Sequence, residues 1–194
     1  MTVGKFTIER NVGGIDGLCV LTPAVYGDSR GYFTETYNKA DLENLGIFLD
    51  FIQDNQSMSS RGVLRGLHYQ TGHPQAKLVR VLQGRVFDVA VDLRRDSPTW
   101  GKWYGLELTG ENRKQLLIPR GFAHGFLVLS DTAEFCYKCD DYYHPEDEGG
   151  LLWNDPAVGI TWPEVVGDTL TDGTPVALNQ RDRNWSTLDL AYKF

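Results

Sequence analysis

The chain has 194 residues, a net charge of −7 and an isoelectric point near 5.0. This acidic balance argues against a nucleic-acid binder, which usually carries a basic surplus. The length fits one domain with a real core, and 12% aromatic residues with 21 glycines favour strands joined by tight turns. We therefore expect a single domain over residues 1–194.

The sequence also predicts where the protein works. Residues 1–8 lack the apolar core of a signal peptide, and no apolar run approaches transmembrane length. Three cysteines cannot form a disulfide framework, and Cys136 and Cys139 lie three apart in a strand-like run, so they point to opposite faces. We expect a reduced, cytoplasmic protein with no membrane or nucleic-acid partner.

Most predicted elements are short strands separated by turns, with one helix. Asn38 can cap that helix, Gly46 can end it, and Leu42 and Leu45 would form its buried stripe. The Gln83-Gly84 pair predicts a tight hairpin. The expected strands are 18–22, 32–37, 51–58, 63–70, 77–82, 85–93, 102–109, 115–118, 124–129 and 132–139.

About ten short strands with close turns favour an antiparallel sandwich or barrel of jelly-roll type. In the strand 85–93, Phe87, Val89, Val91 and Leu93 share one face, while Asp88, Ala90 and Asp92 share the other. The segment after Tyr142 is dense in Pro, Gly, Asp and Trp, which predicts packed loops and one or two short helices.

The most informative stretch is Arg61-Gly-Val-Leu-Arg-Gly-Leu-His-Tyr-Gln70, followed by Lys77. It places His68 and three cations within seventeen residues of an acidic chain. Histidine exchanges protons near neutral pH, and fixed cations suit an anionic substrate and a developing oxyanion. The pattern favours proton abstraction beside a carbonyl. The alternative is a surface histidine between two arginines on an edge strand.

A second histidine, His124, ends the run Pro119-Arg-Gly-Phe-Ala-His, which resembles the second cupin motif. The first cupin motif should supply His-x-His and a later Glu, but here the corresponding stretch is His68-Tyr-Gln70. Catalytic zinc or iron needs three protein ligands. We therefore expect no metal site, and a metal-dependent cupin enzyme remains the less favoured alternative.

Several blocks in order carry a narrower resemblance over roughly residues 15–190. They are Asp28-Ser-Arg-Gly-Tyr-Phe-Thr-Glu35, Gln53-Asp-Asn-Gln-Ser57, the stretch 61–70, Lys77-Leu-Val-Arg-Val81, Val86-Phe-Asp-Val-Ala-Val-Asp-Leu-Arg94, Pro119-Arg-Gly-Phe-Ala-His-Gly-Phe126 and Trp153-Asn-Asp-Pro-Ala-Val-Gly-Ile160. The chain resembles the dTDP-4-dehydrorhamnose 3,5-epimerase family of cupin-fold nucleotide-sugar epimerases. The resemblance implies a mainly β fold, a double-stranded β-helix or jelly roll with a few short helices.

The resemblance also implies roles for individual residues. It assigns His68 as the base, Tyr137 as the acid, Lys77 to the enolate oxygen and Asp182 behind the base. Strand alternation places Phe135, Tyr137 and Cys139 on one face, so Tyr137 can point into a barrel mouth. Without the resemblance, a core tyrosine is the simpler interpretation. The implied substrate-binding residues are Arg30, Glu35, Gln53, Asn55, Arg65, His124, Glu148 and Arg181.

Three further points concern geometry. Arg65 and His68 have opposite strand parity, so they share a face only if Gly66 bends or bulges the strand. We expect Asp88 to orient His124, because both lie in barrel-strand blocks. Arg181 stands where the family often has lysine, which keeps the charge but alters the geometry.

The implied reaction converts dTDP-4-dehydro-6-deoxy-D-glucose to dTDP-4-dehydro-β-L-rhamnose in dTDP-L-rhamnose biosynthesis. No cofactor is expected, because the ketone of the substrate is the electron sink. The family implies a homodimer with an N-terminal strand crossing between subunits. The alternatives are an epimerase acting at C3 or C5 only, in another deoxysugar pathway, and a catalytically dead sugar-binding module.

Overall fold

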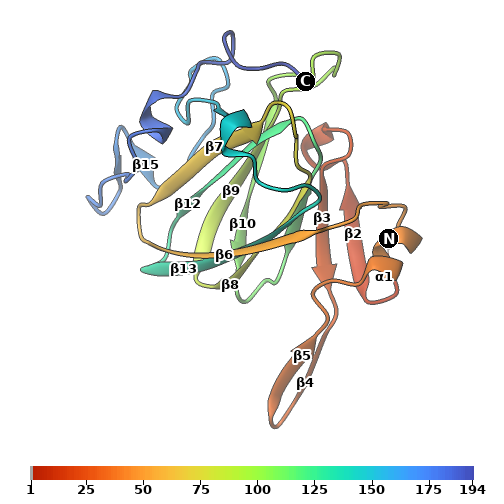
Figure 1. The fold of residues 1–194 in the computed structure, drawn as a ribbon. Coiled ribbons are helices and arrows are strands. Elements are labelled where there is room, and N and C mark those ends of the chain that lie inside the picture. Colours follow the sequence, from red (N-terminus) through yellow and green to blue (C-terminus); the bar gives the residue numbers. More distant parts are fainter. Residues whose placement is uncertain (1) are drawn as a thin grey trace.

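The computed structural model describes residues 2–194, which form two antiparallel sheets facing each other (Figure 1). The larger sheet has the strand order β1-β2-β3-β11-β8-β13-β6, and the smaller one β10-β9-β12-β7-β14. The bounds of the larger sheet are β1 Thr2–Val3, β2 Phe6–Arg10, β3 Cys19–Pro23, β6 Gln53–Ser60, β8 Lys77–Gln83, β11 Gln115–Ile118 and β13 Thr132–Cys139. Those of the smaller sheet are β7 Leu64–Gln70, β9 Arg85–Asp92, β10 Trp103–Thr109, β12 Phe122–Val128 and β14 Glu148–Gly150. The predicted cupin-like jelly-roll class is confirmed.

The remaining elements are small. The hairpin strands are β4 Val25–Asp28, β5 Gly31–Thr34, β15 Val165–Val166 and β16 Thr169–Leu170, and the helices are α1 Lys39–Asn44, η1 Val12–Gly14, η2 Pro145–Asp147 and η3 Asp182–Asn184. The helix prediction is confirmed: the Asn38 side chain accepts a hydrogen bond from the Asp41 amide, and Leu42 and Leu45 are buried. No helix within residues 2–194 has the length and apolar character needed to cross a membrane.

The tight hairpin predicted at Gln83-Gly84 is wrong. Gly84 does join β8 to β9 with a positive φ of 81°, but β8 pairs with β11 and β13, whereas β9 pairs with β10 and β12. The glycine therefore turns the chain from one sheet to the other. A Cβ here would lie 2.1 Å from the carbonyl oxygen of Thr132, so glycine is required by close approach as well as by φ.

Strand β9 is packed on both faces, which explains why it carries apolar side chains on each of them. Val86 and Ala90 pack between the two sheets, while Val89 and Val91 pack against the C-terminal segment. Trp153 and Trp162 of that segment belong to the same cluster. The loops after residue 150 thus form a third layer over the smaller sheet, as the blue segment in Figure 1 shows. The prediction of packed loops there is confirmed.

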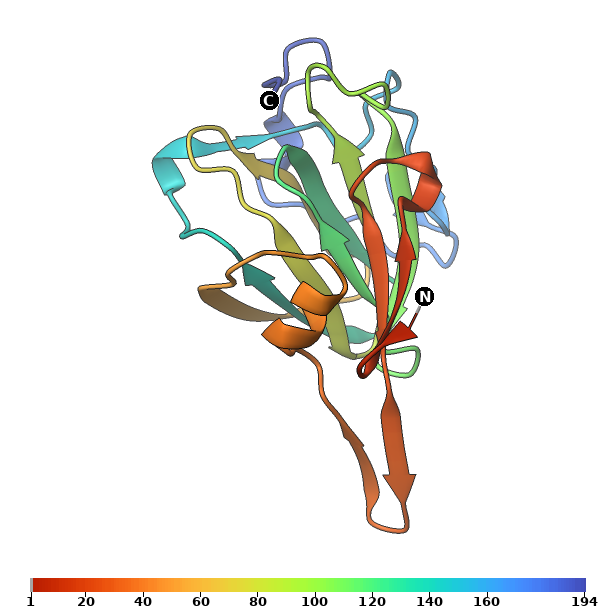
Figure 2. The ribbon, with the colours of Figure 1, turned by 90° about the vertical axis from the view of Figure 1, so that its right-hand side faces the viewer.

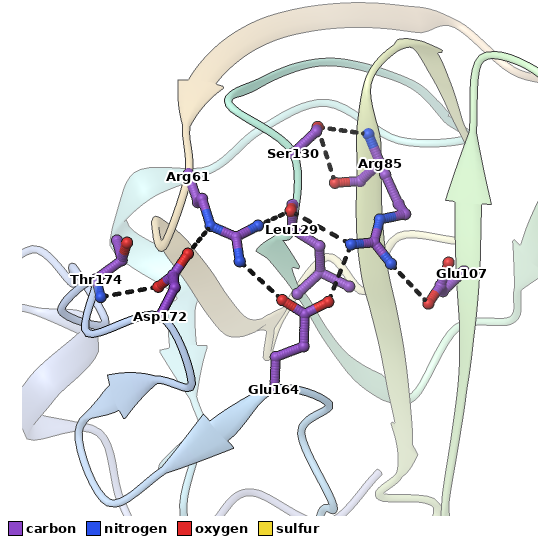
Figure 3. A network of polar contacts seen from close by, with 8 residues as sticks. All are labelled: Arg61, Arg85, Glu107, Leu129, Ser130, Glu164, Asp172 and Thr174. Atoms are coloured by element: carbon purple, nitrogen blue, oxygen red, sulfur yellow. Dashed lines mark hydrogen bonds and ion pairs between the residues drawn. The ribbon is translucent and has the colours of Figure 1, made fainter.

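Arg61 helps to hold this third layer in place (Figure 3). Its guanidinium donates to Glu164 at 2.8 Å and to Asp172 at 2.6 Å, and it also donates to the Leu129 carbonyl. Arg85 on β9 donates to the other oxygen of Glu164 at 2.9 Å. Glu164 therefore bridges two arginines, and Arg61 holds residues 164–172 against the sheets.

The β4–β5 hairpin projects away from the two sheets (Figures 1 and 2). It carries exposed aromatic side chains, with Tyr26 at 54% exposure and Tyr32 and Phe33 at 62% each. Apolar surface of this kind on a protruding element is typical of an interface.

Candidate active site

A cavity of about 330 Å³ opens between the two sheets. Its walls come from β6, β8 and β13 on one side and from β7, β12 and β14 on the other. The lining residues are Gln53, Asn55, Ser57, Arg65, His68, Tyr69, Gln70, Gln75, Lys77, His124, Gly125, Phe126, Phe135, Tyr137, Cys139, Tyr143, Glu148 and Arg181. Nine of the twelve residues predicted for the site line this cavity, and Asp182 contacts one of them.

His68 is held from behind by a buried carboxylate. Its Nε2 lies 2.8 Å from Oδ1 of Asp182, a residue 114 positions later and only 1% exposed. Asp182 Oδ2 accepts from the Gly66 amide at 3.1 Å, and Oδ1 also accepts from Trp185 Nε1 at 3.2 Å. With Nε2 engaged, Nδ1 is the ring nitrogen left to take a proton.

The charge state of Asp182 follows from these contacts. Burial alone raises the pKa of this carboxyl, but the hydrogen bond and charge of His68, with the Gly66 and Trp185 donors, outweigh burial and hold the pKa below its ordinary value. The carboxylate therefore stays ionised, and it can stabilise an imidazolium at His68.

The predicted bulge at Gly66 is confirmed. On β12, His124 pairs with His68 and Phe126 pairs with Arg65, so β7 carries one extra residue between the paired positions. Gly66 has a φ of 118°, and a Cβ on it would lie 2.6 Å from the Gly125 Cα. The extra residue brings Arg65 and His68 to the same face, where both line the cavity.

Tyr137 faces the cavity from the opposite sheet. Phe135, Tyr137 and Cys139 alternate along β13 and all line the cavity, as strand parity predicted. Burial raises the pKa of Tyr137, so the phenol is protonated at neutral pH. The neighbouring Lys77 on β8 has its Nζ 6.0 Å from the Tyr137 ring centroid, and burial lowers its pKa.

His124 is oriented by a second buried carboxylate, as predicted. Its Nε2 lies 3.0 and 3.1 Å from the two oxygens of Asp88, which is fully buried on the neighbouring strand β9. Phe135 stacks on the imidazole with centroids 6.1 Å apart. The cavity thus contains two imidazoles, each with its own aspartate.

A polar rim surrounds the mouth of the cavity. Gln53 donates to Asn55 at 3.1 Å and accepts from the Tyr143 amide at 3.0 Å. Glu148 accepts from the Tyr143 hydroxyl at 2.9 Å and forms an ion pair with Arg181. Arg65 donates from Nε to Ser59 at 3.0 Å, a bond that does not use the two terminal amino groups of the guanidinium.

Arg30 and Glu35 do not reach this cavity. Arg30 lies in the turn between β4 and β5, where its side chain is 88% exposed and pairs with Asp28. Glu35 follows the hairpin and forms an ion pair with Lys5 at 2.8 Å. Their predicted role in substrate binding stays a prediction for this chain.

Sequence reasoning missed several residues of the site. Tyr143 and Gln75 lie in loops with no periodicity to reveal their direction, and Trp185 contacts the back of the site from a loop near the C-terminus. The His68 and Trp185 rings meet edge to face, with centroids 5.9 Å apart. The short spacing between Asp182 and Trp185 is the one sequence signal that could have linked the tryptophan to the predicted site.

The arrangement has the groups needed to move protons to and from opposite faces of a bound compound. His68 belongs to the smaller sheet and Tyr137 to the larger, so a compound bound between them would have an imidazole on one side and a phenol on the other. Lys77, Arg65 and Arg181 supply positive charge around the same space. Such a site suits an anionic carbonyl compound.

Comparisons with known proteins agree with this class. The family model described as dTDP-4-dehydrorhamnose 3,5-epimerase matches residues 13–189. The dTDP-4-dehydrorhamnose 3,5-epimerase of Methanothermobacter thermautotrophicus is 52% identical over 175 residues, which are 90% of this chain and 91% of that protein. The chain belongs to the dTDP-4-dehydrorhamnose 3,5-epimerase family, and the predicted family and enzyme class, an isomerase, are confirmed.

Solved structures place the fold in the same family. The epimerase of Legionella pneumophila, in complex with dTDP-4-keto-L-rhamnose, aligns with a TM-score of 0.89 and 47% identity, covering 97% of this chain and 98% of that one. A 3'-monoepimerase of Streptomyces bikiniensis, in complex with dTDP-quinovose, aligns with a TM-score of 0.80 and 32% identity, covering 90% and 85%.

Proposed function

We propose that the chain is a dTDP-4-dehydrorhamnose 3,5-epimerase, which converts dTDP-4-dehydro-6-deoxy-D-glucose to dTDP-4-dehydro-β-L-rhamnose. One observation carries the proposal: the His68–Asp182 pair and Tyr137 face one cavity from two different sheets. Relatives that bear this name and share half or more of their residues with the chain support the choice of substrate.

In the proposed reaction His68 removes the proton from the carbon next to the 4-keto group. The electrons of the broken C–H bond move to the ketone oxygen, where Lys77 stabilises the enolate. Tyr137 then delivers its hydroxyl proton to the opposite face, and exchange with water restores both groups. Asp182 stabilises the imidazolium while it exists. The cycle runs once at C3 and once at C5.

The proposed reaction needs no cofactor. The ketone accepts the electron pair, so neither a redox group nor a metal is needed for the bond changes. A general base contributes about 10²–10⁴-fold, and the charged surroundings of the enolate supply the rest. Activity that survives a chelator would separate this reaction from that of a metal-dependent cupin.

The cations at the mouth suit the diphosphate of the substrate. Arg65 and Arg181 line the cavity, and a guanidinium can bind phosphate oxygens in a bidentate fashion. The amides of Gln53 and Asn55 and the carboxylate of Glu148 offer hydrogen bonds to the nucleoside and sugar. His124, held by Asp88, is placed to hydrogen-bond the sugar deeper in the cavity.

We further propose a homodimer in which the β4–β5 hairpin of one copy reaches the cavity of the other. The hairpin projects from the molecule (Figure 2). Its side chains Tyr26, Tyr32 and Phe33 are exposed. This arrangement gives Arg30 and Glu35 the substrate-binding role that they lack within one copy. Residues 1–194 would then act as one cytoplasmic domain per subunit.

A mixing experiment tests the dimer. Arg30→Ala and His68→Ala proteins should each be inactive, because one loses a diphosphate contact and the other the base. Exchange of subunits then creates one cavity with both defects and one that is intact. Activity in the mixture, absent from either protein alone, is the expected result. An inactive mixture of proteins that have exchanged subunits would contradict the crossing hairpin.

The second candidate function is epimerisation at one carbon. The 3'-monoepimerase of Streptomyces bikiniensis shares the fold, so the same base and acid suit either outcome. The identity of 52% to the double epimerase of Methanothermobacter thermautotrophicus, against 32% to that monoepimerase, favours two epimerisations.

The base is tested by His68→Ala. This protein should bind dTDP with unchanged affinity and should lose proton exchange at both carbons, measured by NMR in heavy water. If the chain were a catalytically dead sugar-binding module, the unmodified chain would bind dTDP without any proton exchange. Full epimerisation by the His68→Ala protein would overturn the assignment.

A further inference from the structure

Two loops beside the cavity bring together three residues that the proposed reaction does not use. They are His73, His144 and Asp147, and their ligand atoms all lie within 4.8 Å of one another. His73 belongs to the connection between β7 and β8, whereas His144 and Asp147 belong to the connection between β13 and β14. His73 Nδ1 is hydrogen-bonded to Asp147 Oδ2, and the two imidazoles stack with centroids 3.9 Å apart.

The backbone that carries these side chains is held by hydrogen bonds. Buried Gln70 donates to the His73 carbonyl at 2.7 Å and to the Tyr142 carbonyl at 3.1 Å, and its Oε1 accepts from the His144 amide at 2.7 Å. The Thr71 amide donates to the Asp147 carbonyl at 2.9 Å. The three ligand positions are therefore fixed relative to one another before any ion binds.

Local geometry directs the side chains to one point. The Asp147 amide donates to the His144 carbonyl at 3.0 Å across the η2 turn, which brings side chains three residues apart to one side. Gly72 leaves room for the carboxylate, since a Cβ there would lie 2.8 Å from Asp147 Oδ2.

The charges of the surroundings favour a cation. The Asp147 carboxylate is hydrogen-bonded to His73, and its negative charge favours a bound cation at this position. Glu146 Oε1 also lies 3.3 Å from His144 Nδ1. Two imidazole nitrogens and a carboxylate are typical ligands of Zn²⁺ and similar transition metals, whereas Mg²⁺ and Ca²⁺ prefer oxygen alone.

We propose that His73, His144 and Asp147 form a binding site for a divalent transition-metal ion, with Zn²⁺ as the best-suited ion. The site lies outside the proton-transfer chemistry, but Asp147 precedes Glu148 of the cavity rim. A bound ion would join the two loops and stiffen that rim. We expected no metal site from the sequence, in which His73 and Asp147 are 74 residues apart.

Calorimetric titration of the untagged, chelator-treated chain with ZnCl₂ tests the site. One equivalent should bind, and MgCl₂ should not compete. Removal of an outer-shell partner already costs about 10–100-fold in metal affinity, so His73→Gln and Asp147→Asn should each cost at least that much. Both side chains are partly exposed, so we expect the two variants to fold. Thermal unfolding of each variant without zinc checks this expectation.

The matched control is His68→Gln, which removes an imidazole–carboxylate pair in the cavity and should bind zinc as the unmodified chain does. Zinc should also raise the unfolding temperature of the control and not that of His73→Gln. The proposal is overturned if the unmodified chain does not bind zinc. It is equally overturned if His73→Gln and Asp147→Asn retain full affinity.

Discussion

Asp182→Asn tests the geometry behind the base most sharply. Asp182 Oδ2 accepts from the Gly66 amide, while Oδ1 faces His68 Nε2 and the Trp185 donor. An asparagine that keeps the Gly66 bond with its oxygen must turn its amino group towards His68. That group donates to Nε2 and places the ring proton on Nδ1, the nitrogen that has to accept the substrate proton. The opposite orientation sets an amino group against the Gly66 N–H.

The expected magnitude follows from these contacts. A hydrogen bond to a charged group contributes about 1.5–3 kcal/mol, which is about 10–100-fold in rate at about 1.4 kcal/mol per factor of ten. The wrong tautomer adds to this loss, up to the value of a general base, about 10²–10⁴-fold. We therefore predict that kcat falls about 10²-fold or more.

The assay is the rate of deuterium entry at C3 and C5 from heavy water, followed by NMR. Trp185→Phe is the control, because it removes one 3.2 Å bond to the same carboxylate and leaves the His68 contact in place; its rate should fall only a few-fold. An Asp182→Asn protein that folds normally and exchanges within a few-fold of the unmodified rate would refute the account of the base.

Three further predictions concern the acid, the cation and the core. Tyr137→Phe should retain part of the proton abstraction but lose product formation. The control is Tyr142→Phe, which changes an exposed tyrosine outside the cavity and should behave as the unmodified chain does. Proton exchange is measured by NMR and turnover by product analysis, and an equal loss of both in Tyr137→Phe would contradict the role of the acid. Lys77→Met should lower kcat by about 10²–10³-fold, the effect of removing one oxyanion donor, and an unchanged kcat would exclude contact with the enolate. Asp92→Asn should destabilise the fold, because bonds from Arg94, Ser97 and Thr99 outweigh burial and lower the pKa of Asp92 from 3.8 to about 2. That difference corresponds to about 2 kcal/mol of unfolding free energy at about 1.4 kcal/mol per pKa unit. This stability is present above about pH 4 and is lost as the pH falls towards 2. The free energy of unfolding in urea should therefore depend less on pH in the variant than in the unmodified chain over this range. An identical pH dependence in the two proteins would contradict the assignment.

Most of the longer strands and the helix α1 could be predicted because their signals are local. The cap at Asn38 and the alternation of Phe135, Tyr137 and Cys139 depend on neighbours in sequence, and both are found. Strand parity, together with the roles that the resemblance implied for Arg65 and His68, also predicted the bulge at Gly66.

Long-range pairing could not be predicted in the same way. The turn at Gly84 has the composition of a hairpin, but the partners of β8 and β9 are chosen by packing between the sheets. Strand β2 was missed although Phe6 and Ile8 alternate into the core, since its run of five residues is short. The pairing of Asp182 with His68 spans 114 residues, so only the family resemblance indicated it.

Arg61 illustrates how composition misleads about a site. It stands four residues from Arg65 in the most informative stretch, but it binds Glu164 and Asp172 on the outer layer (Figure 3). Arg65 reaches the cavity because it lies next to the bulge. The local backbone geometry decides where each arginine side chain points, and a count of charges in the sequence does not describe that geometry.

The most direct test of the account follows the unmodified chain in heavy water with dTDP-4-dehydro-6-deoxy-D-glucose. NMR of the product should show deuterium at both C3 and C5, with both centres inverted. Label at one carbon alone would contradict the double epimerisation, and binding of the substrate without any label would contradict the proton-transfer site itself.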